Sequence, residues 1–258
     1  MSPDTKIMRW IPVLATIIVT MALLMAFVTR SKAVEAASEH DAAPPGPVLV
    51  ELYTSEGCSS CPPADAVLSE LARRDNVIAL GWHVDYWDRL GHPDPFADAA
   101  YSERQRRFNR AIGSGRVYTP QMVINGRVEF VGSRQGEADA NLGTATPLAR
   151  VKIVDVEAGS DTVRARVTSP AGGTLLVMIM EDGLSTKVDR GENAGRLLQH
   201  DAVVRSLATM PIEQDVAIEV EVPLVAKEIR RARMVVVVEE AKSMKSLAAG
   251  SSLLQPGE

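Results

Sequence analysis

The sequence contains little cysteine and no excess of basic residues. Two cysteines among 258 residues are too few for a small domain that is held together by disulfides. Lys and Arg number 28 against 33 Asp and Glu, so the net charge is −5 and the positive surface of a nucleic-acid-binding protein is missing. Disorder over most of the chain is also excluded, because 46% of the residues are hydrophobic. The length then predicts about two modest domains.

A long uncharged run lies near the N-terminus. Residues 10–29, WIPVLATIIVTMALLMAFVT, would span about 30 Å as a helix, which matches the core of a bilayer. Basic residues precede the run and small residues near Ala36 form a cleavage site, as in a secretory signal, but the basic residues that follow it suit an uncleaved anchor. We expect residues 1–36 to be a signal peptide or an N-terminal membrane anchor and residues 37–47 to be a flexible tether. In both cases the remainder is exported, to the periplasm or the cell envelope.

Residues 48–142 have the pattern of an α/β domain. Short β-prone runs alternate with segments of helical spacing, an order that implies two parallel strands joined by a helical crossover. Asn125-Gly126 between two β-prone runs is typical of a hairpin turn. The predicted strands are 48–53, 77–84, 121–124 and 128–131, and the predicted helices are 62–72, 97–112 and 135–142.

Residues 147–241 have the pattern of a small all-β domain. The predicted strands are 151–156, 163–167, 175–180, 216–222 and 234–238, without a helical pattern among them, which favours a β-sandwich. We expect residues 191–204, which include His200 and Asp201, to form a loop and an edge strand, and residues 242–258 to form a frayed tail. The predicted fold class is therefore an α/β domain followed by a small all-β, sandwich-like domain.

Cys58 and Cys61 have the CxxC spacing of a redox-active pair. A thiolate is the attacking species, and a free cysteine with a pKa of about 8.5 is mostly protonated at neutral pH. We expect Cys58 to lie at the N-terminus of a helix, where the helix dipole stabilises an anion, and Cys61 to be less exposed. Two other interpretations remain open. One is a structural disulfide, whose four-residue loop contributes only about 2 kcal/mol; the other is a metal site completed by His83, His92 or His200.

His83, Asp85 and Trp87 form a second candidate group. On an extended segment their spacing places all three on one face, at the end of a strand next to the cysteine strand. There Asp85 or His83 could move protons or contact substrate while Trp87 lines a groove beside Cys58. The alternative is that His83 and Asp85 bind loop backbone and Trp87 fills the core.

Four arginines on the predicted helix 97–112 form a charged run with Glu103. These are Arg104, Arg106, Arg107 and Arg110. Such a run is typical of a solvated helix face, supported here by a Glu103–Arg107 pair four residues apart.

The residues of the first domain resemble the thioredoxin-like superfamily. The resemblance rests on a strand that leads into Cys-Ser-Ser-Cys at a helix start, followed by Thr119-Pro120, a strand, an Asn-Gly turn and another strand. It implies that Cys58 is the exposed nucleophile, that Cys61 resolves the mixed disulfide, and that Pro120 is cis and lies against the disulfide. Thr119 would then line the substrate groove. Glu51 falls one residue farther from the first cysteine than the buried carboxylate that assists proton transfer in thioredoxins.

Longer segments resemble an exported thioredoxin-like family known as domain-of-unknown-function family 1223. They are VELYTSEGCSSCPPAD, HVDYWDRLGHPDPF, YTPQMVINGR and GENAGRLLQHDAVVR. This resemblance covers nearly all of the chain after the tether and implies no particular activity.

The sequence therefore predicts an exported thiol–disulfide oxidoreductase, with a redox-active disulfide and no other cofactor. Its expected partners are a protein or small thiol substrate and a membrane electron donor, and the direction of transfer leans toward reduction or exchange. One alternative is a Cu(I)-binding or copper-delivery protein that uses Cys58, Cys61 and His83. The other is a non-enzymatic envelope binding module with an inert disulfide.

Overall fold

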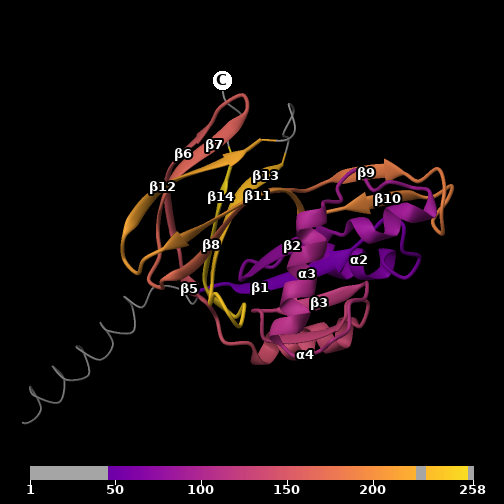
Figure 1. Cartoon of the computed structure of the whole chain (residues 1–258), viewed down its shortest axis with the longest axis horizontal. Helices are drawn as coiled ribbons and strands as arrows, with labels where there is room; N and C mark the ends of the chain where they lie inside the picture. The colour runs from indigo at the N-terminus through magenta and orange to yellow at the C-terminus, as the bar shows by residue number, and fades with distance from the viewer. Residues whose placement is uncertain (1–45, 225–230, 255–258) are drawn as a thin grey trace, which may run out of the picture. The chain divides into compact units, whose positions relative to one another are not determined.

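Two halves of the chain contribute to one continuous β-sheet. The computed structural model describes residues 46–224 and 231–254 (Figure 1). The predicted signal or anchor, residues 1–36, and all but the last two residues of the tether lie outside these ranges. Within the described ranges no helix combines the length and the apolar character that a membrane span needs.

The N-terminal half consists of strands and helices in the predicted order. β1 (Val48–Thr54) is buried along its whole length and pairs in parallel with β2 (Val77–His83), while the crossover helix α2 (Pro62–Leu71) has its prolines in the first turn. The remaining elements are the 3-10 helix η2 (Asp85–Leu90), α3 (Ala99–Ala111), β3 (Gln121–Ile124), β4 (Val128–Val131) and α4 (Gln135–Thr144). Asn125 and Gly126 both have positive φ in the turn between β3 and β4, which confirms the predicted hairpin.

The C-terminal half is all β. Its strands are β5 (Ala149–Arg150), β6 (Lys152–Ala158), β7 (Thr162–Thr168), β8 (Gly173–Glu181), β9 (Leu184–Lys187), β10 (Leu197–His200), β11 (Val203–Ile212), β12 (Ala217–Pro223), β13 (Ala232–Glu239) and β14 (Ser246–Leu253). β12, β7 and β6 form a separate three-stranded sheet, and β9 pairs with β10 in a hairpin.

The nine-stranded sheet crosses the predicted domain boundary at residues 142–147. Its strand order is β4-β3-β1-β2-β11-β8-β13-β14-β5, so β2 of the first half neighbours β11 of the second. The two strands meet at a single register pair, Gly81 with Val203, and the Gly81 N–H donates to the Ala202 carbonyl at 2.7 Å. The fold is therefore mixed α/β with one large sheet and few helices. A two-domain arrangement is not confirmed, since the described residues 46–224 and 231–254 belong to one compact unit.

Strand β8 shows how the core is shared. Leu176 and Met178 belong to the hydrophobic core of the N-terminal half, whereas Leu175 and Val177 belong to the core under the three-stranded sheet. Side chains alternate between the two faces of a strand, so a strand buried on both faces needs an unbroken apolar run. The sequence Leu175–Met180 is such a run, and all six of its residues are buried.

Two expectations about the C-terminal half are wrong. Residues 242–258 were expected to form a frayed tail, but Ser246–Leu253 form β14, which pairs antiparallel with β13. Small residues make this possible, because Ala248 and Ala249 are fully buried and a Cβ at Gly250 would lie 2.6 Å from the Val151 carbonyl oxygen. Segment 191–204 contains a loop and β10 as expected, but β11 begins at Val203 and runs in the interior of the sheet rather than at an edge.

Candidate active site

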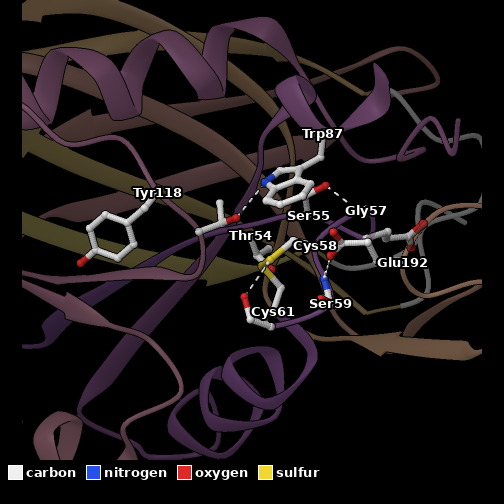
Figure 2. Close-up of a disulfide and its surroundings, with 12 residues drawn as sticks. Thr54, Ser55, Gly57, Cys58, Ser59, Cys61, Trp87, Tyr118 and Glu192 are labelled. Atoms are coloured by element: carbon white, nitrogen blue, oxygen red, sulfur yellow. Dashed lines mark hydrogen bonds between the residues drawn. A yellow bond between two sulfur atoms is a disulfide. The ribbon is translucent and has the colours of Figure 1, made fainter. Parts of the chain in front are cut away.

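The two cysteines form a disulfide between the end of β1 and the start of α2. After Thr54 the chain turns, and the Cys58 N–H donates to the Ser55 carbonyl at 3.2 Å. α2 begins at Pro62 with Cys61 as its N-cap, and the Cα atoms of the two cysteines are 5.4 Å apart (Figure 2). Cys58 therefore lies three residues before the N-cap, not at the helix N-terminus as expected, because the helix begins only after the disulfide loop.

Both cysteines are buried. Their exposed fractions are 1% for Cys58 and 0% for Cys61, so the exposed nucleophile that the resemblance implied is not seen in the disulfide form. Part of the cover is Trp87, whose indole lies over the turn that carries Gly57 and Cys58 (Figure 2). A Cβ on Gly57 would be 2.9 Å from the Trp87 Cβ, so glycine permits this approach.

The loop between β9 and β10 supplies further contacts. Asn193, which is fully buried, donates its Nδ2 to the carbonyl oxygens of Glu56 at 2.9 Å and Cys58 at 3.0 Å. The neighbouring Glu192 carboxylate accepts from the Ser59 N–H at 3.0 Å, and this contact with Ser59 lowers the pKa of Glu192. Sequence reasoning missed Asn193. The sequence feature that could have indicated Asn193 is the Gly-rich loop 191–196, which begins the family-resembling segment GENAGRLLQHDAVVR. A loop pattern does not show which residues the loop contacts.

Trp87 lies beside the disulfide and contacts Thr119 (Figure 2). The Trp87 Nε1–H donates to Thr119 Oγ1 at 2.8 Å. The Thr119–Pro120 peptide bond is cis, in agreement with the resemblance. A Cβ placed on Gly132 would lie 3.1 Å from Ala64 and 3.5 Å from Pro120, so Pro120 is close to the first turn of α2.

His83, Asp85 and Trp87 do not share one face, because the strand ends at His83 and η2 begins at Asp85. The Asp85 carboxylate accepts from the Ser102 hydroxyl at 2.5 Å and so connects η2 to α3. His83 points into the interior, where its Nδ1 lies 2.7 Å from Asp94 Oδ2. The expectation of a common face assumed extended backbone through residue 87 and is therefore wrong.

Three histidines and three carboxylates form a buried cluster next to the cysteine turn. We call it the histidine–carboxylate cluster; its members are His83, His92, His200, Glu56, Asp65 and Asp94. Glu56 is the centre. Its carboxylate contacts His92 Nε2 at 2.7 Å and His200 Nε2 at 3.0 Å, and its N–H donates to Asp94 at 2.8 Å. Asp65 accepts from the Thr54 hydroxyl at 2.7 Å.

Burial and hydrogen bonds pull the pKa values of the cluster in opposite directions. Burial would raise the pKa of Glu56, but hydrogen bonds from His200 and His92 outweigh it and lower that pKa. The pKa of Asp94 is lowered against the effect of burial by His83, and the pKa of His83 is raised by Asp94. Asp65 differs, because burial dominates and raises its pKa.

Glu51 does not lie with this cluster. It accepts from the Trp82 indole at 3.0 Å and from Arg104 at 2.6 Å, and Arg104 also pairs with Glu239. Glu51 and Thr54 are three residues apart on β1, so they point to opposite faces of the sheet, and Thr54 is the one that contacts α2 through Asp65. The proton-transfer position suggested for Glu51 is therefore not supported by its contacts.

Arg104 also corrects the expectation of a solvated helix face. It is 6% exposed, and its guanidinium lies 5.0 Å from the centre of the Trp82 ring. Glu103 pairs with Arg106 at 3.6 Å and Arg110 at 2.6 Å, not with Arg107. A run of charges does not reveal that one member faces a buried carboxylate.

The contacts of His83 bear on the copper alternative. Its Nδ1 is engaged by Asp94, and the two thiols that would complete the site are joined in a disulfide. Among residues 46–224 and 231–254, no three His, Cys, Asp or Glu side chains are arranged to hold a metal ion.

Comparison with known proteins adds a family and several relatives. Residues 49–239 match the family described as "Protein of unknown function (DUF1223)". A thioredoxin of Methanocaldococcus jannaschii is 32% identical over 91 residues, which are 35% of this chain and 86% of the thioredoxin. This supports a distant thioredoxin-like relationship.

Two solved structures are similar over most of the chain. A crystal structure of a protein from Agrobacterium tumefaciens has a TM-score of 0.62 and 28% identity, and the match covers 84% of this chain and 97% of that protein. HBP35 of Porphyromonas gingivalis has a TM-score of 0.54 at 15% identity, covering 82% of this chain and 76% of that chain, and shows a similar fold.

Proposed function

We propose that this chain, which belongs to the DUF1223 family, is an exported thiol–disulfide oxidoreductase that uses Cys58 and Cys61. The observation that carries the proposal is the Cys58–Cys61 disulfide at the start of α2, in a chain with a distant thioredoxin relative. Thr119-Pro120 and Trp87 lie at the same place and supply a surface for the substrate.

The reaction exchanges one electron pair and two protons. In the reducing direction the Cys58 thiolate attacks a substrate disulfide, which forms a mixed disulfide and releases one substrate thiol. Cys61 then loses its proton and attacks the Cys58 sulfur, so the intramolecular disulfide forms and the second substrate thiol leaves. A thiol reductant restores the dithiol, and the oxidising direction is the reverse.

The assignment of Cys58 as nucleophile rests on its place as the first cysteine of the CxxC motif and on a neighbouring hydroxyl group. Ser60 Oγ lies 3.3 Å from the Cys58 Sγ and could donate to a thiolate there. Cys61 is the N-cap of α2 and is fully buried, which suits the resolving thiol. Because Trp87 and the 191–196 loop cover Cys58, a substrate must displace part of this cover to reach the sulfur.

Export, substrate and electron donor are parts of the same proposal. The uncharged N-terminal run favours a periplasmic or envelope location, with either a cleaved signal or one membrane anchor. The substrate is a protein or a small thiol, and the electrons come from a membrane donor if the protein acts as a reductase. The disulfide is then the redox group, without a further cofactor.

The reduction potential of the Cys58–Cys61 pair tests this proposal. The full chain is equilibrated with glutathione mixtures and its thiols are trapped. We expect a potential between about −120 and −270 mV, the range of known exchangers. Cys58→Ser should abolish exchange, while Cys61→Ser should accumulate a mixed disulfide on Cys58. A potential well below about −300 mV in a folded protein would instead identify an inert, structural disulfide.

A further inference from the structure

A buried carboxyl group lies one helical turn from the resolving cysteine. The Asp65 N–H donates to the Cys61 carbonyl at 3.0 Å, and side chains four residues apart on a helix are neighbours. Asp65 is 8% exposed, and the Thr54 hydroxyl holds one of its carboxylate oxygens. Asp65 is the acidic residue in the first turn of the helix that Cys61 caps, whereas Glu70 lies farther along the same helix.

His200 brings an unpaired nitrogen to the same carboxyl group. Its Nε2 contacts Glu56, whereas its Nδ1 is buried, has no hydrogen-bond partner and lies 4.0 Å from Asp65 Oδ2. A buried polar atom without a partner is costly, and the side chain is only 2% exposed. When Nε2–H donates to the Glu56 carboxylate, the neutral imidazole presents Nδ1 as a proton acceptor toward Asp65.

Several elements surround His200 with titratable groups. Glu56 follows β1, Asp65 is on α2, and the His83 ring of β2 lies 5.0 Å from the His200 ring. Beyond η2, Phe96 packs on His200, while Asp94 and His92 contact His83 and Glu56. Arg205 lies over the Phe96 ring, 5.1 Å from its centre.

We propose that Asp65 and His200 carry the proton that Cys61 releases when it resolves the mixed disulfide, an inference that rests on the proposed function. The Cys61 S–H proton passes to the Asp65 carboxylate and then to His200 Nδ1, while the Cys61 sulfur bonds to Cys58 and the substrate thiolate leaves. That thiolate takes a proton from solvent, and the proton on His200 returns to solvent after the step, so charge balances. His200 acts through Asp65 and is a positioning residue for this transfer.

Other carboxylates do not fit this role. Glu51 is bound to Arg104 and Trp82 on the opposite face of β1, and Glu192 accepts from a backbone N–H at the exposed Ser59. The raised pKa of Asp65, caused by burial, brings the carboxyl closer to the pKa of a thiol and so favours proton transfer between them.

The test measures the resolving step alone. The reduced full chain is mixed with glutathione disulfide, quenched in acid at intervals and analysed by mass spectrometry for the glutathionylated and the oxidised forms. We expect His200→Gln and Asp65→Asn to slow the conversion of the first form into the second by about a hundredfold. In the unaltered protein the rate should rise with pH through the pKa of Asp65. This inflection should be absent from Asp65→Asn, leaving only the ionisation of the Cys61 thiol, and should move to higher pH in His200→Gln, which keeps Asp65 but loses the nearby imidazole that lowers its pKa.

His92→Gln is the matched control. His92 also contacts Glu56 through Nε2, but no hydrogen bond or ion pair joins it to Asp65 among the described residues, so its resolving rate and pH profile should stay within about twofold of the unaltered protein. Circular dichroism confirms that each variant is folded, and Asp65→Asn carries the test if His200→Gln does not fold. Unchanged rates and pH profiles in folded variants would overturn the inference while leaving the oxidoreductase intact. A chain that never becomes glutathionylated would overturn the proposed function instead.

Discussion

Single residues decide where charge is placed inside this protein. Arg104 is almost completely buried, and it is held by Glu51 from β1 and Glu239 from β13. One cation faces two carboxylates in the interior. Burial raises the pKa of Glu51, Arg104 opposes this increase, and the nearby Glu239 adds to it. Arg104 is the group that makes the burial of these two carboxylates tolerable.

Replacing Arg104 by methionine should therefore destabilise the protein strongly. The variant R104M leaves two carboxylates buried without their cation, and we expect the free energy of unfolding at pH 7 to fall by about 3–5 kcal/mol. The folded pKa of Glu51 is already above its unfolded value, and loss of Arg104 raises it further. The loss of stability should therefore be smallest at acidic pH, where Glu51 is protonated in both proteins. It should grow as the pH rises from the folded pKa of Glu51 in the unaltered protein to its higher folded pKa in R104M.

Urea unfolding between pH 5 and pH 8 measures this effect. Arg106→Met is the control, since Arg106 is a half-buried residue of the same helix whose pair with Glu103 contributes about 0–1 kcal/mol. A pH-independent loss in R104M would show that packing, not charge, is what Arg104 contributes.

At the level of elements, the β9–β10 hairpin controls the turn that carries Cys58. Asn193 fixes two carbonyl groups on either side of Gly57, and Glu192 and Thr186 bind Ser59 and Glu56. These contacts cross more than a hundred residues of sequence. A contact over that separation leaves no local pattern, whereas β1, α2 and the Asn125-Gly126 hairpin follow from periodicity and turn residues nearby.

Asn193→Ala should make the disulfide more reactive. The variant leaves the Glu56 and Cys58 carbonyls without their donor, at a cost of about 1–3 kcal/mol, and so loosens the covered turn. We expect reduction by dithiothreitol under pseudo-first-order conditions to become about tenfold faster, because 1.4 kcal/mol corresponds to tenfold in an equilibrium for opening.

Glu192→Gln is the control, because it keeps an acceptor for the Ser59 N–H at an exposed position. Dithiothreitol should reduce the disulfide of this variant at the same rate as that of the unaltered chain. Equal rates in N193A and the unaltered chain would mean that Trp87 alone limits access to Cys58.

The same local view explains what the sequence predicted of the site and what it did not. The cysteine pair and the cis Thr119-Pro120 bond follow from motif and resemblance, whereas Trp87 was named on the assumption of an extended backbone and contacts Thr119 from η2 instead. The histidine–carboxylate cluster does not, because its members come from β2, α2, β10 and two loops and each has an ordinary local context. β14 was missed for another reason: small residues look polar in sequence but allow a strand to pack closely.

For the whole molecule, the nine-stranded sheet joins the two halves that the sequence divides at residues 142–147. Strand β8 contributes side chains to the hydrophobic cores on both faces of this sheet. Met178 and Met180 of β8 pack into the core of the N-terminal half, while Ile179 between them packs under the three-stranded sheet. Loss of packing on one face of β8 must therefore be felt on the other, because the same backbone supports both.

Ile179→Ala should thus lower the stability of both halves together. The change removes a side chain that is 1% exposed and should cost about 2–5 kcal/mol. Fluorescence of Trp82 and Trp87 reports the N-terminal half, although Ile179 lies in the other core, and far-ultraviolet circular dichroism reports all strands. In urea both probes should give one transition, with midpoints that coincide and shift equally in I179A, since a single compact unit unfolds cooperatively.

Glu221→Gln, which alters an exposed pair with Arg164 on the three-stranded sheet, should leave both midpoints nearly unchanged. If I179A moved only the circular dichroism transition, the β2–β11 contact would be a junction between two independently folding domains, and the boundary at residues 142–147 would be a true one.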